Sequence, residues 1–391
     1  MTADPGGVDG LGICLVGPAW PHRGGISHYN TCLALEASRR HDVRVIGYSR
    51  LYPKMFFPGR TQFDESESSH MVDSERLIDS VNPLTWVRAG WSIARGRPDL
   101  TVVQWWHPYF APAVTKICSM VRLFSSSRIV FICHNVVPHE GSPAARLMSA
   151  AAFRTAHGFI VQSSDDREHL LEIRRNAEVI VRPHPIYDFF RTGDTTREEA
   201  RRAIGAGEGP LILFFGYIRP YKGLRYLLEA MPAITRRTGA RLLVVGEFYE
   251  DSAPYLDLVE ELGIAGVVDF VDRYVGNEEV ERYFTAADLV ALPYVTATQS
   301  GIAQIALAFD RPMVATDVGG LPEVVAEEKT GFLVPPEDPG ALASAAVRFF
   351  EEGWARRMER HFDSEKRRFS WEVMVGALEE MYASTGGRAR G

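Results

Sequence analysis

Residues 298–325 read TQSGIAQIALAFDRPMVATDVGGLPEVV, and the order of elements in this stretch decides the fold class. Its second half, from Arg311, predicts a short buried strand, then a glycine turn, then the start of a helix. Its first half predicts a loop that closes into a helix, with Ser300 and Gly301 at the turn. Strand, glycine turn and helix in this order are the unit from which parallel α/β sheets are built.

The same unit recurs along the second half of the chain. The segment GPLILFFGYIRPYKG (209–223) predicts a strand followed by a glycine loop, and the next residues, LRYLLEAMPAITRRTG, predict an amphipathic helix that ends at a glycine. Short apolar runs predict further buried strands at 240–247, 267–272, 287–294 and 312–320.

The first half of the chain shows the pattern independently. The segment LGICLVGP (11–18) predicts a buried strand, and PHRGGISHY predicts a glycine loop that opens a helix. Pro183 and Pro185 interrupt the pattern. Further apolar runs lie at 100–106, 128–135, 158–164 and 177–185.

Two successive sets of strands and helices predict an α/β fold of two Rossmann-like domains that face a central cleft. We expect a disordered N-terminal tail over 1–10, an N-terminal domain over 11–185, a C-terminal domain over 186–368 and a final amphipathic helix over 369–391.

The composition excludes several classes of protein. A net charge of −7 argues against a nucleic-acid-binding protein. The first 185 residues hold 20 Lys and Arg against 17 Asp and Glu, a formal charge of +3, so the remainder carries −10. The four cysteines form no CxxC pair, and no signal peptide or run of 18 apolar residues is present, so we expect a cytoplasmic protein.

Two cations follow the strand that opens the second half. Arg219 and Lys222 lie three residues apart, just before a predicted helix start. Backbone amides at a helix start, together with fixed cations, form a site for a diphosphate, and Ser300–Gly301 is a second such helix start. The alternative is a solvated basic loop. The order GxxxxGK[ST] is absent, which argues against a P-loop nucleotidase.

Two segments of the first half also carry candidate residues. Gly24 and Gly25 lie after the first strand, where open α/β sheets bind ligands and where glycine lets the backbone approach a ligand. His134 directly follows another apolar strand, so a functional histidine and a structural one are both open. A metal site of His134, His139 and Glu140 is a weaker alternative, because this spacing matches no known zinc pattern.

Taken together, these segments resemble the retaining glycosyltransferases of family 4, which have the GT-B fold. The resemblance covers about residues 11–385. It is carried, in this order, by GPAWPHRGGISHY, ICHN, GYIRPYKGL, LLVVGE, DLVALPY, RPMVATDVGGLPEVV, TGFLVPPED and FSWEVMVGALEEMY.

The resemblance implies transfer of a sugar from a nucleotide diphosphate sugar with retention of the anomeric configuration, without a metal or another cofactor. It places Lys222, Gly25, Ser300 and Gly301 at the donor diphosphate and His134 beside the transferred sugar as the catalytic residue. The family's arginine falls on Tyr217, so we expect Arg219 to take its place. Gly24 and His28 are expected on the acceptor side, and the last helix is expected to pack back on the N-terminal domain.

One part of the family pattern is missing. The two glutamates of the family's Glu-x7-Glu motif fall on Ala297 and Ile305, so neither carboxylate is present. Neutral side chains are expected to replace their hydrogen bonds to the sugar and ribose: Thr298, Gln299 and Gln304.

The missing glutamates leave two other functions open, a non-catalytic GT-B partner subunit and, less favoured, a nucleotide-sugar 2-epimerase. The expected partners are a nucleotide sugar and a glycan or lipid-linked acceptor. The basic-aromatic segments RLYPKMFFPGR (50–60) and WVRAGWSIARGR (86–97) suggest peripheral contact of the N-terminal domain with the inner face of the cell membrane, or else core aromatics with a solvated basic rim.

Overall fold

The structure is a computed structural model, and it describes residues 10–53, 62–64, 72–136, 143–191, 193 and 195–386. The chain divides into two compact units. Unit 1 contains the described residues up to Pro183 together with those from Ser370 onward, and unit 2 contains the described residues of His184–Phe369. The predicted tail over 1–10 falls outside the described residues except for Gly10.

Unit 1 is built on a parallel sheet of seven strands in the order β3-β2-β1-β4-β5-β6-β7. Its central strands are mostly apolar and almost entirely buried, as expected for strands covered by helices on both faces. The strands are β1 (Gly12–Val16), β2 (Asp42–Arg50), β3 (Ser74–Asp79), β4 (Leu100–Trp105), β5 (Arg128–Cys133), β6 (Gly158–Val161) and β7 (Val179–Val181).

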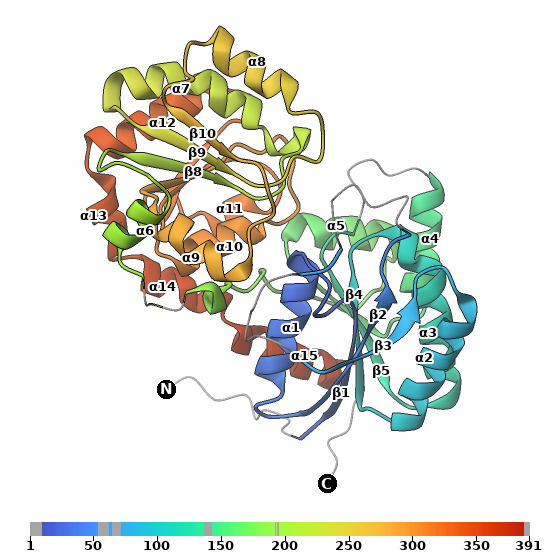
Figure 1. Ribbon diagram of the computed structural model, residues 1–391. Helices are drawn as coiled ribbons and strands as arrows, with labels where there is room; N and C mark the ends of the chain where they lie inside the picture. The colour runs from blue at the N-terminus through green and yellow to red at the C-terminus, as the bar shows by residue number, and fades with distance from the viewer. Residues whose placement is uncertain are drawn as a thin grey trace. The chain divides into compact units, whose positions relative to one another are not determined.

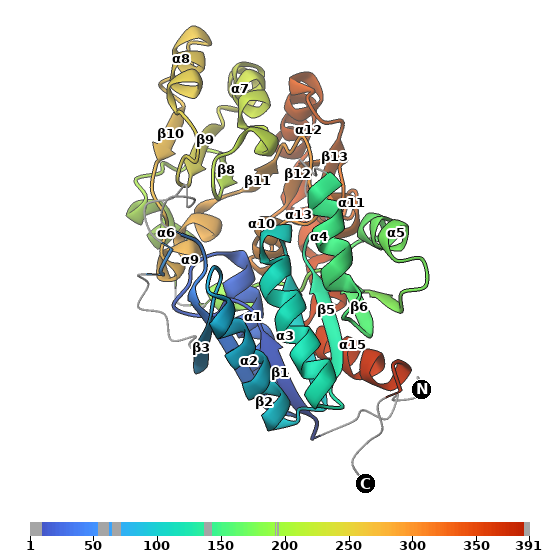
Figure 2. The same cartoon turned by 90° about the vertical axis from the view of Figure 1, so that its right-hand side faces the viewer.

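Helices cover both faces of this sheet (Figure 1). One face carries α1 (Gly25–Ala37) and α15 (Trp371–Ser384), which contact each other. The opposite face carries α2 (Pro83–Gly96), α3 (Ala111–Phe124) and α4 (Pro143–Phe153), which lie side by side in Figure 2. The remaining helical segments of unit 1 are η2 (Pro108–Phe110) and α5 (Ser164–Ile173).

The final helix returns to unit 1, as the sequence predicted. Ser370 caps its first turn by accepting from the amide of Val373 at 3.2 Å. Glu379 of α15 accepts from the His41 Nε2–H at 2.9 Å, although the two residues are far apart in the sequence. Both side chains are buried, so this contact ties α15 to the loop before β2.

Unit 2 is built on a parallel sheet of six strands in the order β10-β9-β8-β11-β12-β13. The strands are β8 (Leu211–Phe215), β9 (Arg241–Val245), β10 (Val268–Val271), β11 (Leu289–Leu292), β12 (Met313–Thr316) and β13 (Gly331–Val334). The helices are η3 (Asp188–Phe190), α6 (Arg197–Ala203), η4 (Pro220–Lys222), α7 (Leu224–Thr238), α8 (Ala253–Glu261), α9 (Asn277–Ala286), α10 (Gly301–Ala308), α11 (Leu321–Val324), α12 (Pro339–Glu351), α13 (Trp354–Glu359), α14 (Phe362–Lys366) and η5 (Arg367–Phe369).

The strand orders confirm the prediction of two Rossmann-like units and show where a ligand is expected in each. In unit 1 the order reverses between β1 and β4, and in unit 2 between β8 and β11. Open α/β sheets bind ligands beyond the carboxyl ends of the strands at such a reversal. In unit 2 these ends lead into the segments 216–223 and 293–300, which contain Arg219, Lys222 and Ser300.

Candidate active site

The first feature of unit 2 is a buried lysine at the end of the β8 loop. Lys222 is 7% exposed, and its ammonium lies 5.3 Å from the centre of the Tyr294 ring. A Cβ atom on Gly216 would lie 2.9 Å from the Lys222 Nζ and 3.3 Å from the Ile302 Cδ1, so the ammonium adjoins the first turn of α10. The β8 loop and the start of α10 therefore converge on Lys222.

The charge of Lys222 is incompletely balanced. Within the described ranges, no carboxylate lies at ion-pair distance from its ammonium. Burial lowers the pKa of Lys222, and the neighbouring Arg219 cation lowers it further. A buried ammonium has few water contacts, and this one has no counter-ion among the described residues. A phosphate group bound beside it would supply the missing negative charge.

Tyr294 joins the two loops. Its ring lies under the Lys222 ammonium, and its hydroxyl is 3.2 Å from the Ser300 Oγ. Ser300 is the N-cap of α10 and accepts from the Ala303 amide at 3.2 Å. Burial raises the pKa of Tyr294 to about 12, so the hydroxyl stays neutral. The sequence interpretation gave Tyr294 no role.

The first turn of α10 completes the cationic character of this region. The amides of Gly301 and Ile302 lie at the start of the helix. Amides in the first turn have no intrahelical carbonyl to donate to. Such amides attract anions, and the helix dipole adds a partial positive charge. Lys222, Ser300 and Gly301, all assigned to the diphosphate from the sequence, are thus close together in unit 2.

Arg219 is held in place by aromatic rings. Its guanidinium lies 4.9 Å from the centre of the Tyr249 ring, and Tyr249 contacts the tilted ring of Tyr217 with ring centres 4.4 Å apart. The two loops that carry these rings run side by side, since Ile218 donates to Glu247 O at 3.0 Å and Tyr249 donates to Ile218 O at 3.1 Å. Tyr217 occupies the position of the family's arginine and supports, through Tyr249, the arginine two residues further on.

The loop before α10 rests on the glycine turn after β12. The Gly320 amide donates to Thr298 O at 3.0 Å. A Cβ atom on Gly319, whose φ is 51°, would lie 1.6 Å from Ala297 O, and one on Gly320 would lie 2.1 Å from the Gln299 Nε2. Only glycine allows this approach, which explains the DVGG sequence.

The three neutral residues proposed for the sugar and ribose are placed differently. Thr298 and Gln299 are half-buried in the loop before α10. Gln304 is 0% exposed within α10, and neither atom of its side-chain amide has a hydrogen-bond partner among the described residues. Gln304 therefore lies in the interior of unit 2 rather than on the surface that carries Arg219.

The positions of the missing glutamates contain no acid in the structure either. Ala297 is half-buried and Ile305 is buried. The buried carboxylate of Glu281 accepts from the Gly193 amide at 2.8 Å, so it serves the packing of unit 2. Any contact between this loop and a sugar hydroxyl therefore involves amides or neutral side chains.

In unit 1, His134 is buried in a chain of hydrogen bonds. The Asn30 Nδ2 donates to Pro18 O at 3.1 Å, and the Gln104 Nε2 donates to the Asn30 Oδ1 at 3.1 Å. The His134 Nε2 is 2.7 Å from the Gln104 Oε1, and the Gln162 Nε2 is 3.1 Å from the His134 Nδ1. Both ring nitrogens therefore have partners within unit 1.

This chain of bonds determines the tautomer of His134. A backbone carbonyl only accepts, so Pro18 O orients the Asn30 amide, and Asn30 in turn orients Gln104. The Oε1 of Gln104 must then accept from His134, which places the proton on Nε2 and leaves Nδ1 to accept from Gln162. With the Gln162 amide oriented this way, the Nδ1 of His134 is the hydrogen-bond acceptor of the ring.

The same bonds bear on the metal alternative. The Nδ1 lone pair of His134 is used by Gln162, while His139 and Glu140 lie outside the described residues. Within the part of the chain that the structure describes, no group of three His, Cys, Asp or Glu side chains is arranged to hold a metal ion. The four cysteines are buried.

The glycine loop of unit 1 is open to solvent. Gly24 is the N-cap of α1 with φ 108°, and a Cβ atom on Gly24 or Gly25 would meet nothing within 4 Å. His28 is half-buried one turn into α1. On the next residue, the Tyr29 ring contacts the His134 ring edge to face at 4.5 Å. Gly24, Gly25, His28 and His134 are thus connected through α1 within unit 1.

Comparisons with known proteins show what this chain is similar to. Residues 209–352 match the sequence model of the family Glycosyl transferases group 1. D-inositol 3-phosphate glycosyltransferase of Corynebacterium glutamicum is 32% identical over 212 residues, which are 52% of this chain and 50% of that protein. The corresponding protein of Streptomyces avermitilis is 31% identical over 257 residues, which are 62% and 55% of the two chains. The chain thus spans about half the length of the curated relatives it matches.

Solved structures extend the similarity to both units. Sucrose-phosphate synthase of Thermosynechococcus elongatus has a TM-score of 0.74 at 20% identity and covers 95% of this chain and 98% of its own. HepE of Anabaena, in complex with UDP, has a TM-score of 0.74 at 17% identity and covers 96% and 100%. At these identities the structures show the fold, and the fold of this chain is GT-B.

The fold and the family match together support a GT-B glycosyltransferase. The matching family, Glycosyl transferases group 1, covers most of unit 2, which contains Lys222 and the first turn of α10.

Proposed function

We propose that the chain transfers a sugar, in the manner of a hexosyltransferase, from a nucleotide diphosphate sugar to an acceptor with retention of the anomeric configuration. The observation that carries this proposal is the buried Lys222 ammonium beside the first turn of α10, without a carboxylate partner in the described residues. The HepE structures in complex with UDP and with UDP-glucose support a nucleotide sugar as the substrate.

The chemistry follows from the charges of unit 2. Transfer breaks the bond between the anomeric carbon and the diphosphate oxygen and forms a bond from that carbon to an acceptor oxygen. The electron pair of the broken bond stays on the diphosphate, whose negative charge rises, and the acceptor hydroxyl gives up its proton to the leaving diphosphate oxygen or to water. Lys222, Arg219 and the amides at the start of α10 are arranged to stabilise that charge, and fixed donors aimed at developing charge are an effective means of lowering a barrier.

Two other functions remain as alternatives because Ala297 and Ile305 replace the family's glutamates. The first is a non-catalytic partner subunit, which would bind the nucleotide without turning it over. The second, less favoured, is a nucleotide-sugar 2-epimerase, whose chemistry needs an acid and a base at the sugar, and this loop offers neither.

A panel of nucleotide sugars tests the proposal. The full chain, incubated with each donor and with candidate lipid-linked and glycan acceptors in excess EDTA, is expected to release nucleoside diphosphate and glycosylate an acceptor. Transfer in EDTA is expected because Lys222 and Arg219 supply the positive charge that a metal ion provides elsewhere. Activity lost in EDTA and restored by Mg²⁺ or Mn²⁺ would overturn the metal-independent mechanism. Tight nucleotide binding without turnover would favour the partner subunit, and a change of the donor sugar without transfer would favour the epimerase.

The acceptor that we propose is a lipid-linked or cell-surface glycan precursor, glycosylated in the cytoplasm at the inner face of the cell membrane. The basic and aromatic character of unit 1 supports this proposal. Among the described residues, no helix has the length and hydropathy that a bilayer-crossing segment requires. Contact with the membrane would then be peripheral.

A further inference from the structure

A row of exposed apolar side chains follows one side of α2 and continues onto α3. On α2, Leu84 is 79% exposed and Trp91 is 51% exposed, and Val87 is exposed between them. Positions 84, 87 and 91 lie on one face of a helix. The Trp91 ring contacts Phe124 of α3 at 5.2 Å between centres, and Leu123 beside it is 72% exposed. We call these five side chains, with the exposed basic residues among them, the outer face.

The outer face is basic and almost free of acids. Residues 80–128 contain one carboxylate, Asp99, and it accepts from the Gly12 amide at 2.8 Å. Among the described residues, no carboxylate pairs with Arg88, Arg95 or Lys116. The exposed basic residues of α2, of α3 and of the turn after α2 are Arg88, Arg95, Arg97, Lys116 and Arg122.

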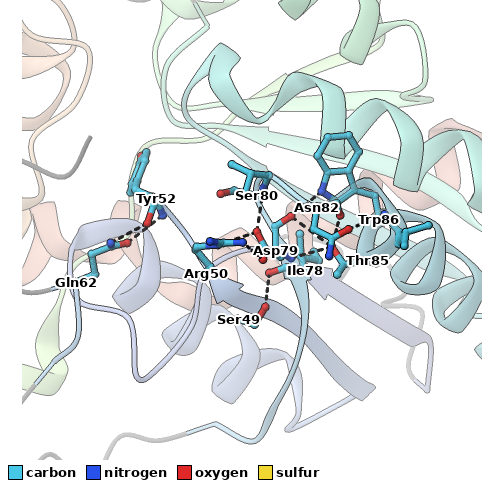
Figure 3. Close-up of polar contacts among 12 residues, drawn as sticks. Ser49, Arg50, Tyr52, Gln62, Ile78, Asp79, Ser80, Asn82, Thr85 and Trp86 are labelled. Atoms are coloured by element: carbon cyan, nitrogen blue, oxygen red, sulfur yellow. Dashed lines mark hydrogen bonds and ion pairs between the residues drawn. The ribbon is translucent and has the colours of Figure 1, made fainter. Parts of the chain in front are cut away.

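The opposite side of α2 is fixed to the sheet by polar contacts (Figure 3). The Trp86 Nε1 donates to Asp79 O at 2.7 Å, and the Asp79 carboxylate accepts from the Arg50 Nε at 3.0 Å. The Asn82 side chain caps the helix by accepting from the Leu84 amide at 3.1 Å. Because α2 is anchored on this side, its apolar row is held facing outward.

Two residues of the basic-aromatic segments already have partners within unit 1. Arg50 is ion-paired with Asp79, and the Trp86 ring nitrogen donates to a backbone carbonyl. The rest of the segment 50–60, with Lys54, Phe56, Phe57 and Arg60, lies outside the described residues except for residues 51–53. The candidate surface within the described residues is therefore the outer face.

We propose that the outer face docks on an anionic lipid bilayer. Trp and Leu side chains that alternate with Arg along a helix insert their apolar parts below the headgroups, while the guanidinium groups stay among the lipid phosphates. The unpaired charges of Arg88 and Arg95 complement such a surface, and an acid-free face is not repelled by it. Leu84 stands out from the helix rather than lining a groove, which favours a bilayer over an acidic protein as the partner.

Vesicle binding tests this proposal without using the transferase activity. The full chain is expected to co-sediment with vesicles of equimolar phosphatidylglycerol and phosphatidylcholine and not with phosphatidylcholine alone. Added salt is expected to weaken binding, because the Debye length falls to about 10 Å at 0.1 M. A folded wild-type chain that ignores anionic vesicles at low salt would overturn the proposal, as would capture by polyglutamate in preference to vesicles.

Two double variants identify the surface. Each arginine near an anionic surface contributes about fivefold to partitioning, so Arg88→Glu with Arg95→Glu is expected to weaken vesicle binding by about 25-fold or more. Leu84→Glu with Trp91→Glu is expected to weaken it at least as much, because charges replace the inserted groups.

The matched controls lie on unit 2. They are Arg236→Glu with Arg356→Glu, both exposed and without an ion pair in the described residues, and Leu256→Glu, whose leucine is 46% exposed on α8. Vesicle binding that falls equally in the controls, or that persists in both outer-face variants, would overturn the assignment. Thermal melting and nucleoside diphosphate affinity, both expected to be unchanged, show that each variant is folded.

Discussion

Replacement of Lys222 by alanine is expected to weaken nucleoside diphosphate binding by a factor of roughly 10 to 100. The ammonium is buried without an anionic partner in the described residues, so the ligand phosphate is the group that neutralises it. A hydrogen bond to a charged group contributes roughly 1.5–3 kcal/mol, which corresponds to this range. Calorimetric titration with the nucleoside diphosphate measures the change directly.

Two further variants make the Lys222 experiment specific. Lys222→Met keeps the aliphatic stem over Tyr294 and removes only the charge, so it is expected to lose nearly as much affinity as Lys222→Ala. Lys329→Ala removes a solvent-exposed lysine of unit 2, paired with Glu365, and is expected to leave the affinity unchanged. Because burial lowers the pKa of Lys222, wild-type affinity is expected to fall as the pH rises through that lowered pKa, earlier than for an exposed lysine. A folded Lys222→Ala variant with wild-type affinity would refute the phosphate site.

Replacement of His134 by alanine is expected to lower turnover by about 100-fold or more while nucleoside diphosphate affinity is retained. The resemblance places His134 beside the transferred sugar, whereas the proposed diphosphate site is in unit 2. Small errors in the position of reacting groups cost about this much in rate. Steady-state kinetics with saturating donor, together with calorimetry, separates the two effects.

Stability needs its own control, because His134 is buried. Its removal breaks the hydrogen bonds of the Gln104 Oε1 and the Gln162 Nε2 to the ring, at a cost of about 1–3 kcal/mol for each buried group left unsatisfied. His41 is also buried in unit 1 and hydrogen-bonded to Glu379. It precedes the amino end of strand β2, however, whereas His134 follows the carboxyl end of β5. His41→Ala is therefore expected to lose stability and keep turnover. Equal loss of turnover in both variants would show that His134 is only structural.

Most of the sheet was predictable because buried parallel strands are short apolar runs. The edge strand β3 was missed because SERLID contains only two apolar residues and only one buried residue, so it is not an apolar run. β13 was not predicted as a strand because its four apolar residues, GFLV, are shorter than the usual signal. The strand-end positions of Lys222 and His134 followed from the sequence, since a strand and the loop after it are contiguous.

The contacts around these residues depend on strand order, which the sequence does not state. Gln104 and Gln162 reach His134 because β4, β5 and β6 are neighbours, so that their carboxyl ends lie in a row. A glutamine at the end of each apolar run, in LTVVQWW and GFIVQSS, was the available signal. Tyr294 lies under Lys222 because strands β8 and β11 pair. The two loops are far apart in the sequence: 71 positions separate Tyr221, next to Lys222, from Leu292, at the end of β11.

Gln304 shows the limit of residue type as a guide. It is polar and lies near the expected sugar site in sequence, so the sequence favoured a ligand contact. In α10, however, position 304 is fully buried, and its side-chain amide has no hydrogen-bond partner among the described residues. The distinction depends on the helical phase, which a short helix after a loop does not reveal.

The central claim is that Lys222 recognises the diphosphate of the donor, and a ligand–variant cycle tests it most directly. Nucleoside diphosphate and the matching monophosphate are titrated into the wild type and into Lys222→Met, with the nucleoside that binds most tightly. The wild type is expected to favour the diphosphate by about tenfold or more, and this preference is expected to largely disappear in Lys222→Met, because the lost charge no longer distinguishes the second phosphate. A preference that persists undiminished in the folded variant would contradict the account.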